Sequence, residues 1–486
     1  MKNRGQTTVF ISFIIGVLLI LTFTALEVVR IHCLRAKIRA VLHSTRTSIM
    51  ADYNRDLFER YHLLFMDPTY GTGSDAMVEE KFSDYITSSL EDDKAVYSCS
   101  VGEVALIRKK TITDDHMQLL KKQIAEYETK EGLAKKAIEL PKNIIDNSKE
   151  VKDASDKTKR NATVLPEDEN ASEEENHFEK NEEHVDDPRD VLKNNLSLGV
   201  LNLVLPEGSV VSKDAQDFSD SPSTKYKEEL KEEKDASFSD VGKMTQALDD
   251  IAKDSDGKGN FATSKLAFSS YVLDHFSYQG KEISDSVMKC EVEYILKGKD
   301  NDYVNLEAVL NEIIWTRMPV NYICLLQDNV KQSEALSLAT AICTATGTMP
   351  MVEIVKHLLL GCWAYGESIC EVRALMHGEK LPYVKTSEKW RTDLKTLCDS
   401  GAVKEEMGMD YKDYLYLMLL RKEGKDITYA RLLDIIEKNL QQENKNLSVV
   451  NLCGELVFQG EIKIGNFFRE DDGEAYSYYF EEKVKY

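Results

Sequence analysis

The residues that could do chemistry are few, and they stand in patterns that no familiar catalytic site uses. The nearest match to a serine-nucleophile turn is GESIC at Gly366 to Cys370, which lacks the second glycine and falls inside a helical pattern. A nucleophile of that kind needs a sharp strand-to-helix turn. The sequence holds no H-E-x-x-H, no phosphate-binding Walker loop and no G-x-G-x-x-G. We therefore predict no catalytic residues and no enzyme activity.

Metal and cofactor sites are equally absent from the sequence patterns. DSDGKG at Asp254 to Gly259 begins like a calcium loop, but its fifth position is Lys258 and its twelfth is Lys265 in place of a glutamate. His177 and His184 stand in an acidic stretch that offers no fixed geometry. The nine cysteines are odd in number and scattered, without a C-x-x-C pair, which predicts buried free thiols. We predict no metal and no cofactor.

The charge of the chain excludes one class of partner. A net charge of −22 over 486 residues argues against nucleic-acid binding, which needs an excess of Lys and Arg. Much of this charge is local, because residues 161–190 hold twelve acidic side chains against Lys180 and Arg189. Residues 143–245 are rich in charged and small polar residues and are predicted to form a disordered acidic linker. An apolar island at Leu196 to Pro206 interrupts it.

The element that must position everything else is a long helix, predicted from Gly5 to Phe65. No charged side chain occurs from Gly5 to Leu26, which is long enough to span a bilayer. Residues 1–29 are therefore predicted to be a transmembrane segment and residues 30–66 an amphipathic stem. A cleaved signal peptide and a plain signal anchor are the alternatives to a helix that packs laterally against other helices.

An apolar stripe follows the span and predicts a packing surface. Its residues recur at three- and four-residue steps: Ile31, Leu34, Ile38, Val41, Thr45, Ile49, Tyr53, Leu57 and Tyr61. A stripe of this kind needs a partner, and a coiled coil with a neighbouring helix would supply one. The residues predicted to make helix–helix contacts are Phe10, Glu27, Leu34, Ile38, Val41 and Ile49. Glu27 either extends toward Arg30 or pairs with a neighbouring helix.

The remainder predicts a mainly α chain with small β parts. Residues 67–142 read as a small α/β segment with a strand near residues 95–108, and residues 246–486 as a mainly helical domain that ends in a small antiparallel sheet. The predicted terminal strands turn at Gly460 and at residues 471–473. Asp302 and Asn305 are candidate helix caps, and Gly378 suits a helix end. Ala335 to Val352 carries no charge but is predicted to be part of a helical hairpin, not a second span.

Two families resemble parts of this sequence. NRGQTTVFISFIIGVLLILTFTALEVVR at the N-terminus resembles the membrane helices of TadE/TadG-type minor pseudopilins of tight-adherence pilus systems. ADYNRDLFERYHLLFMD at Ala51 to Asp67 and the segments at Glu293 to Arg317 and Glu353 to Trp390 are similar to an uncharacterised family of Firmicutes membrane proteins, catalogued as a domain of unknown function. The second resemblance implies an association with Tad-type pilus or secretion systems but no activity.

The pilin resemblance implies a processing site and exposes one departure. A prepilin peptidase would cut after Gly5, which makes Gln6 the first mature residue. The glutamate that pilins place fifth in the mature chain is Phe10 in this sequence. Because that glutamate compensates the amino terminus of the preceding subunit inside a filament, its absence disfavours polymerisation of many copies.

These observations predict a non-enzymatic, pseudopilin-like structural or assembly component of a Tad-type, type II secretion-like surface pilus apparatus. The alternative is a membrane-anchored binding or sensory protein with a tethered helical domain. The predicted partners are other pseudopilin-like or Tad assembly proteins and the membrane, and not nucleic acid. The predicted location is the cell membrane, with a single pass. Arg30, Arg35, Lys37, Arg39 and Arg46 after the span favour a cytoplasmic body, whereas the pilin resemblance places it outside, and we predict an extracytoplasmic body.

Overall fold

The computed structural model describes residues 4–91, 99–130, 188–197, 199–227, 260–382, 389–394, 397, 408–422, 424–465 and 474–486. The predicted fold class is confirmed: the chain is mainly helical, with a long N-terminal apolar helix and a small antiparallel sheet. Most of the acidic linker lies outside the described residues, as do His177, His184 and the loop at Asp254 to Gly259.

The chain divides into two units that differ from the boundaries expected from the sequence. Unit 1 combines Met1–Gln123 with Leu440–Tyr486, and unit 2 is Ile124–Asn439. Unit 2 is therefore inserted between two parts of unit 1. The sheet belongs to unit 1 and is not an appendage of the helical domain.

Unit 1 starts with the long helix α1, Arg4–Met50. Proline is absent from it and its one internal glycine after the first turn is Gly16, so nothing in the sequence breaks the helix at residues 27–30. The helix predicted to reach Phe65 ends at Met50, because Asn54 starts a second helix, α2, at Arg55–Tyr61. The Asn54 side chain accepts a hydrogen bond from the Leu57 backbone N–H at 2.9 Å, as an N-cap does.

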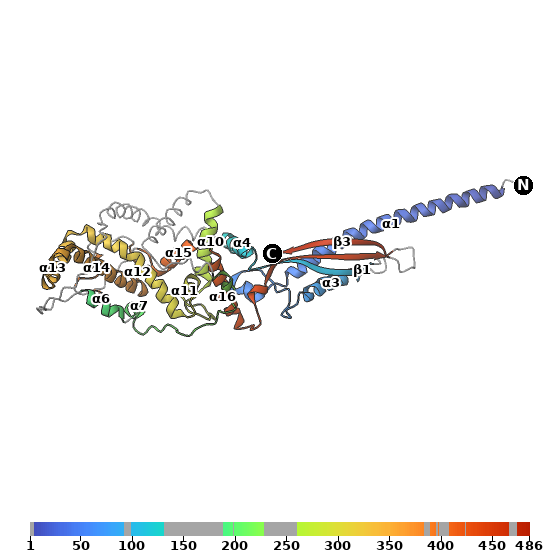
Figure 1. Cartoon of the computed structure of the whole chain (residues 1–486). Coiled ribbons are helices and arrows are strands. Elements are labelled where there is room, and N and C mark those ends of the chain that lie inside the picture. Colours follow the sequence, from blue (N-terminus) through green and yellow to red (C-terminus); the bar gives the residue numbers. More distant parts are fainter. Residues whose placement is uncertain are drawn as a thin grey trace. The chain divides into compact units, whose positions relative to one another are not determined.

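The sheet has three antiparallel strands in the order β1–β2–β3. These are β1 Cys99–Thr111, β2 Cys453–Gly465 and β3 Glu474–Lys485. The second half of α1 and the helix α3, Ala76–Glu91, pack on the sheet and on each other (Figure 1). The buried side chains of this core come mainly from α1, α3, β2 and β3, and β1 adds partly buried ones. The buried set includes Leu34, Ile38, Leu42, Ile49, Phe82, Ile86, Leu456, Phe458, Ile462 and Phe480.

The turn predicted at Gly460 is wrong, because β2 runs through it without interruption. Gly460 pairs with Phe480 of β3, and a Cβ atom at Gly460 would lie 2.6 Å from the Phe480 ring. The glycine therefore makes room for an aromatic ring of the neighbouring strand. A glycine inside a strand often marks such a close approach rather than a turn.

Unit 2 is helical wherever the structure describes regular secondary structure in it. Its elements are the end of α4 (Gln118–Lys130), α6 (Pro188–Ser197), α7 (Val200–Val204), η3 (Pro222–Tyr226), α10 (Asn260–His275), α11 (Glu291–Lys297), α12 (Asp302–Gln327), α13 (Asn329–Ala345), η4 (Met349–Met351), α14 (Val352–Met376), α15 (Tyr411–Lys422) and most of α16 (Asp426–Gln441). The predicted helical hairpin is present as α13 and α14, and Ala335, Ala339 and Cys343 are buried in it.

The predicted caps are partly corrected. Asn301, and not Asp302 or Asn305, is the N-cap of α12, and its side chain accepts from the Val304 N–H at 2.9 Å. The Asp302 carboxylate instead accepts from the backbone N–H groups of Cys290 and Lys289. Gly378 follows the end of α14 with a φ of +82°, as predicted for a glycine beyond a helix terminus.

Candidate functional site

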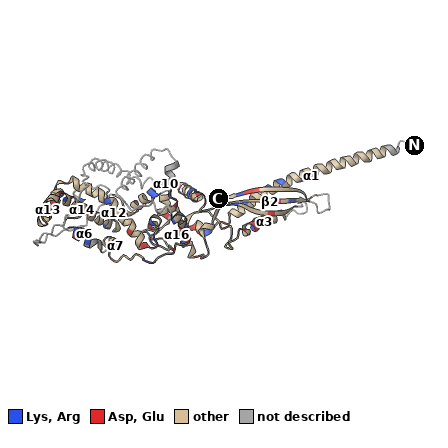
Figure 2. Cartoon of the chain, in the orientation of Figure 1, with Lys and Arg blue, Asp and Glu red and all other residues tan. Residues whose placement is uncertain are grey.

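The first half of α1, residues 7–29, extends beyond the sheet, and we call it the apolar half. Its large apolar side chains, from Val9 to Val29, are between 42% and 72% exposed. At about 1.5 Å per residue it is long enough for a hydrocarbon layer of about 30 Å. Within the described part of the chain, α1 is the one helix long and apolar enough to cross a membrane (Figure 2). A membrane span or signal anchor could therefore lie here.

The hydroxyl groups of the apolar half suit a lipid environment. Ser12 donates to the Val9 carbonyl at 3.0 Å, and Thr22 and Thr24 donate to the carbonyls of Leu19 and Leu21 at 2.8 Å. In hydrocarbon an unpaired polar group is costly, because no water is present to satisfy it. Each of these hydroxyls is satisfied within the helix itself.

Glu27 marks the end of the apolar half and pairs within its own helix. Arg30 donates to Glu27 from Nε at 2.9 Å and from Nη2 at 2.5 Å. The same Nη2 donates to the Gly465 carbonyl at the end of β2, at 2.7 Å. Glu27 was predicted either to extend toward Arg30 or to pair with a neighbouring helix, and the structure contains the pair with Arg30. The contact with Gly465 fixes where the sheet begins along α1.

Four of the residues predicted to contact a partner helix have a different partner. Leu34, Ile38 and Ile49 are fully buried and Val41 is 8% exposed, all in the core of unit 1. The apolar period was read correctly as a buried face. What it contacts is the chain's own sheet and α3, so these residues are not a surface open to another protein.

The other predicted site residues remain in the apolar half or next to it. Phe10 is 64% exposed. Gly5 and Gln6 belong to the first turns of α1, and the structure describes their backbone only. Cleavage between them stays a prediction.

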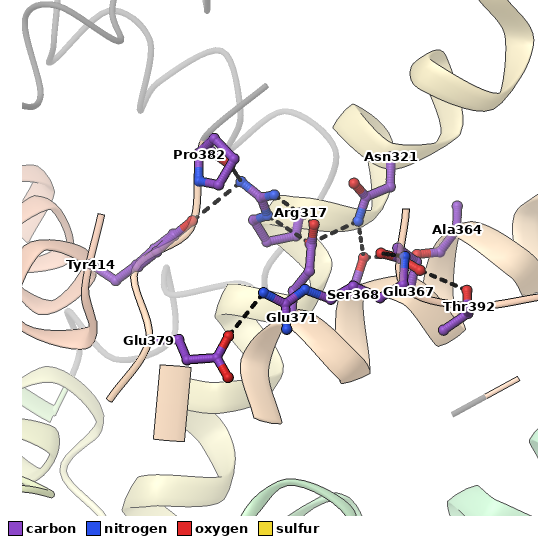
Figure 3. Close-up of polar contacts among 11 residues, drawn as sticks. Arg317, Asn321, Ala364, Glu367, Ser368, Glu371, Glu379, Pro382, Thr392 and Tyr414 are labelled. Carbon is purple, nitrogen blue, oxygen red and sulfur yellow. Dashed lines mark hydrogen bonds and ion pairs between the residues drawn. The ribbon is translucent and has the colours of Figure 1, made fainter. Parts of the chain in front are cut away.

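Unit 2 holds a buried polar network that the sequence did not reveal (Figure 3). Arg317 of α12 is fully buried and forms a two-pronged ion pair with Glu371 of α14: Nε donates to Oε2 at 2.8 Å and Nη2 to Oε1 at 2.7 Å. Arg317 Nη1 also donates to the Pro382 carbonyl at 3.0 Å. Asn321, one turn further along α12, donates to Glu371 at 2.8 Å and to Ser368 at 3.0 Å.

A second carboxylate extends this network along α14. Glu367 is fully buried and accepts from the Thr392 hydroxyl at 2.6 Å and from the Arg391 backbone N–H at 2.9 Å. Trp363 donates from its indole to the Thr392 carbonyl at 3.2 Å. Buried charges are tolerated where they are paired and hydrogen-bonded, and this network meets that condition. It ties α12, α14, Pro382 and the residues Arg391 and Thr392 together.

Ser368, the serine of the GESIC stretch, belongs to this network. Ser368 lies inside α14, where its hydroxyl donates to the Ala364 carbonyl at 2.8 Å and accepts from Asn321. Both of its hydrogen-bonding roles are thus taken within the core. The sequence did carry a signal for the network: Arg317 and Glu371 each interrupt an apolar helical stretch, IIWTRMPV and SICEVRAL.

Glu293 of α11 is a buried carboxyl group in unit 2. It is fully buried, accepts from Tyr411 at 2.8 Å and from the Gln279 N–H at 3.0 Å, and its Oε2 has no hydrogen-bond partner among the described residues. Burial raises the pKa of Glu293 to about 7. Burial also raises the pKa values of Asp413 and Asp434, each to about 6.

We expect unit 2 to lose stability as the pH rises from about 4.5 to 7. Between these pH values folded Glu293 keeps a proton that the unfolded chain releases. The free energy of unfolding is therefore highest below pH 4.5, the ordinary pKa of the group, and falls by on the order of 3 kcal/mol as the pH rises to about 7, the pKa in the folded chain. Urea unfolding of the detergent-solubilised full-length chain at pH 5 and pH 8 measures this. Glu293→Gln should lose less stability over that interval, and equal losses in both proteins would contradict the assignment.

Among the comparisons with known proteins, the chain matches one family model. Residues 178–464, more than half of the chain, match a family of unknown function (DUF5702). The chain belongs to this family. The match runs from before α6 to the end of β2, so it includes the described part of the inserted unit from α6 onward and the central strand of the sheet. No curated protein and no solved structure matches the chain.

The family match names no activity and begins after β1. Helix α1 lies outside the matched residues. So does the segment at Ala51 to Asp67, whose sequence is similar to the uncharacterised family of membrane proteins. The match fits an uncharacterised family, as predicted, but does not link it to Tad systems. The link to Tad systems is supported by the resemblance of the N-terminal residues to pseudopilins.

Proposed function

We propose that this protein is a non-enzymatic, pseudopilin-like structural or assembly component of a Tad-type surface apparatus. The observation that carries the proposal is the division of one continuous helix, α1. Its second half is held in the core of unit 1, and its first half is exposed along 23 residues. The resemblance to pseudopilins rests on a basic tip and a spanning helix that continues into an amphipathic stem. The division of α1 agrees with that arrangement.

A helix held in this way couples the membrane to the folded part. Because α1 has no break between the apolar half and the core of unit 1, a lateral contact in the membrane also orients the sheet. The structure removes Leu34, Ile38, Val41 and Ile49 from any such contact. The apolar half, which includes Phe10, is left to make it, and the partners we propose are other pseudopilin-like or Tad assembly proteins.

One face of the apolar half suits close helix packing. Thr8, Ser12 and Gly16 recur every four residues, which places them on one face, and a Cβ atom at Gly16 would meet nothing within 4 Å. Small residues allow helix backbones to approach closely in a membrane, where dispersion contacts rather than the hydrophobic effect drive association. We place the body of the protein outside the cytoplasm, following the pilin resemblance.

We expect Gly16→Leu to weaken recovery of the protein with its membrane partners several-fold, because the leucine side chain prevents the close approach of helix backbones that a small residue allows. The measurement is quantitative co-purification from crosslinked membranes, scored only for single-span proteins with a basic tip and an apolar N-terminal helix. Ile14→Phe adds bulk on the opposite face and serves as the control. Equal recovery of both variants would reduce α1 to a simple anchor.

A membrane-anchored binding protein is the second candidate, favoured by an exposed apolar surface in unit 2. Met349 and Met351 of η4 and Ile354 and Leu358 of α14 are between 46% and 57% exposed. Replacing residues 7–25 by an unrelated apolar span separates the two candidates. A binding protein keeps its function after that exchange, whereas the proposed structural component loses it.

A further inference from the structure

The part of α1 that follows the apolar half has a charge unlike that of the rest of the chain. Residues 28–50 hold five Lys and Arg side chains and no acidic residue, in a chain of net charge −22. Arg30 is paired with Glu27. Arg35, Lys37 and Arg39 come next, and we call these three residues the basic collar. Arg39 is exposed, and Arg35 and Lys37 are partly exposed.

The collar lies just beyond the headgroup layer, within reach of it, if the apolar half fills the hydrocarbon layer. Arg35 is six residues beyond Val29, about 9 Å along the helix axis. The headgroup layer extends about 5–7 Å beyond the hydrocarbon on each side. Long basic side chains bend toward that layer with their apolar stems on the lipid, and attraction persists over a Debye length of about 10 Å. All three collar residues fall within this range.

The sheet contributes an aromatic residue at the same level. The guanidinium of Arg35 lies 4.8 Å from the ring centroid of Tyr476, near the start of β3, and donates a hydrogen bond to its hydroxyl. Tyr476 is 37% exposed. Tyrosine is enriched where membrane meets water, because its ring is apolar and its hydroxyl is polar. The hydrogen bond from Arg30 to the Gly465 carbonyl places the end of β2 at this same end of the sheet.

We propose that the basic collar, together with Tyr476, binds the anionic headgroups of a phospholipid surface. The collar thereby sets how deeply α1 sits and holds the near end of the sheet against the membrane. Because the rest of the chain is strongly acidic, an anionic surface attracts this face and repels the others. The proposal goes beyond the proposed function and applies on either side of the membrane.

The test uses the purified full-length chain in mixed micelles that contain equal amounts of phosphatidylglycerol and phosphatidylcholine. Native mass spectrometry gives the ratio of the two lipids retained. We expect several-fold enrichment of phosphatidylglycerol that falls with added sodium chloride, because each basic side chain near an anionic surface is worth about five-fold. In Arg35→Gln/Lys37→Gln/Arg39→Gln the ratio should approach one.

The matched control removes the same charge elsewhere in unit 1. Arg55, Arg108 and Lys122 are exposed, and the triple Gln variant at these positions should keep the enrichment of the unchanged chain. Circular dichroism melts confirm that each variant folds, and Arg39→Gln alone, at an exposed site, provides a milder change. The same loss in control and collar variants would overturn the proposal. So would displacement of the lipid by inorganic phosphate at matched ionic strength, which would indicate a small-anion site.

Discussion

Ile38→Asp should unfold unit 1 while unit 2 stays folded. Ile38 is fully buried between α1 and the sheet, so aspartate loses about 2–3 kcal/mol of apolar burial and places a carboxylate where the described core provides no cation. The total cost, about 5 kcal/mol or more, is comparable to the whole stability of a typical domain. This expectation separates a buried core position from a surface that binds another helix.

Cysteines in the core make this result measurable in the intact chain. Cys453 is fully buried in unit 1, and burial raises the pKa of its thiol to about 12, so it should react slowly while unit 1 is folded. Cys343 and Cys370 report in the same way on unit 2. Peptide-level mass spectrometry after alkylation should show fast labelling of Cys453, with Cys343 and Cys370 still slow, in Ile38→Asp.

Ala40→Asp is the matched control for this experiment. Ala40 is exposed two residues further along the same helix, so it receives the same charge without burial. Surface substitutions of this kind usually change stability by less than about 0.5 kcal/mol. Slow labelling of Cys453 in both variants would mean that α1 does not depend on the sheet, and the core described for unit 1 would be wrong.

Arg317→Met should destabilise unit 2 by about 3–5 kcal/mol, because it leaves the carboxylate of Glu371 buried without its guanidinium. The change keeps much of the apolar volume of the arginine stem. Urea unfolding followed by alkylation of Cys370, which neighbours Glu371, measures the loss. The pair excludes water on both sides, with side chains 0% and 1% exposed, so screening by solvent is small.

The double variant Arg317→Met/Glu371→Leu distinguishes the buried charge from simple packing. Replacing both partners removes the uncompensated carboxylate, and we expect part of the stability to return. Recovery should be incomplete, because Asn321 and the Pro382 carbonyl each lose a hydrogen-bond partner. A double variant as unstable as Arg317→Met alone would show that the cost comes from lost packing.

The sequence predicted the elements better than their partners. The period of Leu34, Ile38 and Val41 correctly indicated a buried face, but a period of 3.6 does not state whether a helix or a sheet covers it. The strands β2 and β3, which supply the sheet side of this core, are separated from α1 by the whole of unit 2, and no local pattern encodes that packing.

The polar features of the candidate site were harder to predict for a related reason. Arg317 and Glu371 are far apart in the sequence and meet only because α12 and α14 pack together. The Gly460 error has the same origin, since Phe480 of another strand determines why a glycine is needed. The apolar half itself was predictable, because its composition and length are local properties.

The order of the strands along the chain has a consequence for synthesis on the ribosome. β2 occupies the centre of the sheet, yet it is translated after both α1 and the inserted unit. Until β2 and β3 emerge, the stripe of α1 lacks the two strands that complete its buried core, although the apolar half is already available to the membrane. Exposed apolar surface of that kind attracts chaperones and proteases. We therefore expect truncated products that stop before β2 to be degraded faster than the complete chain.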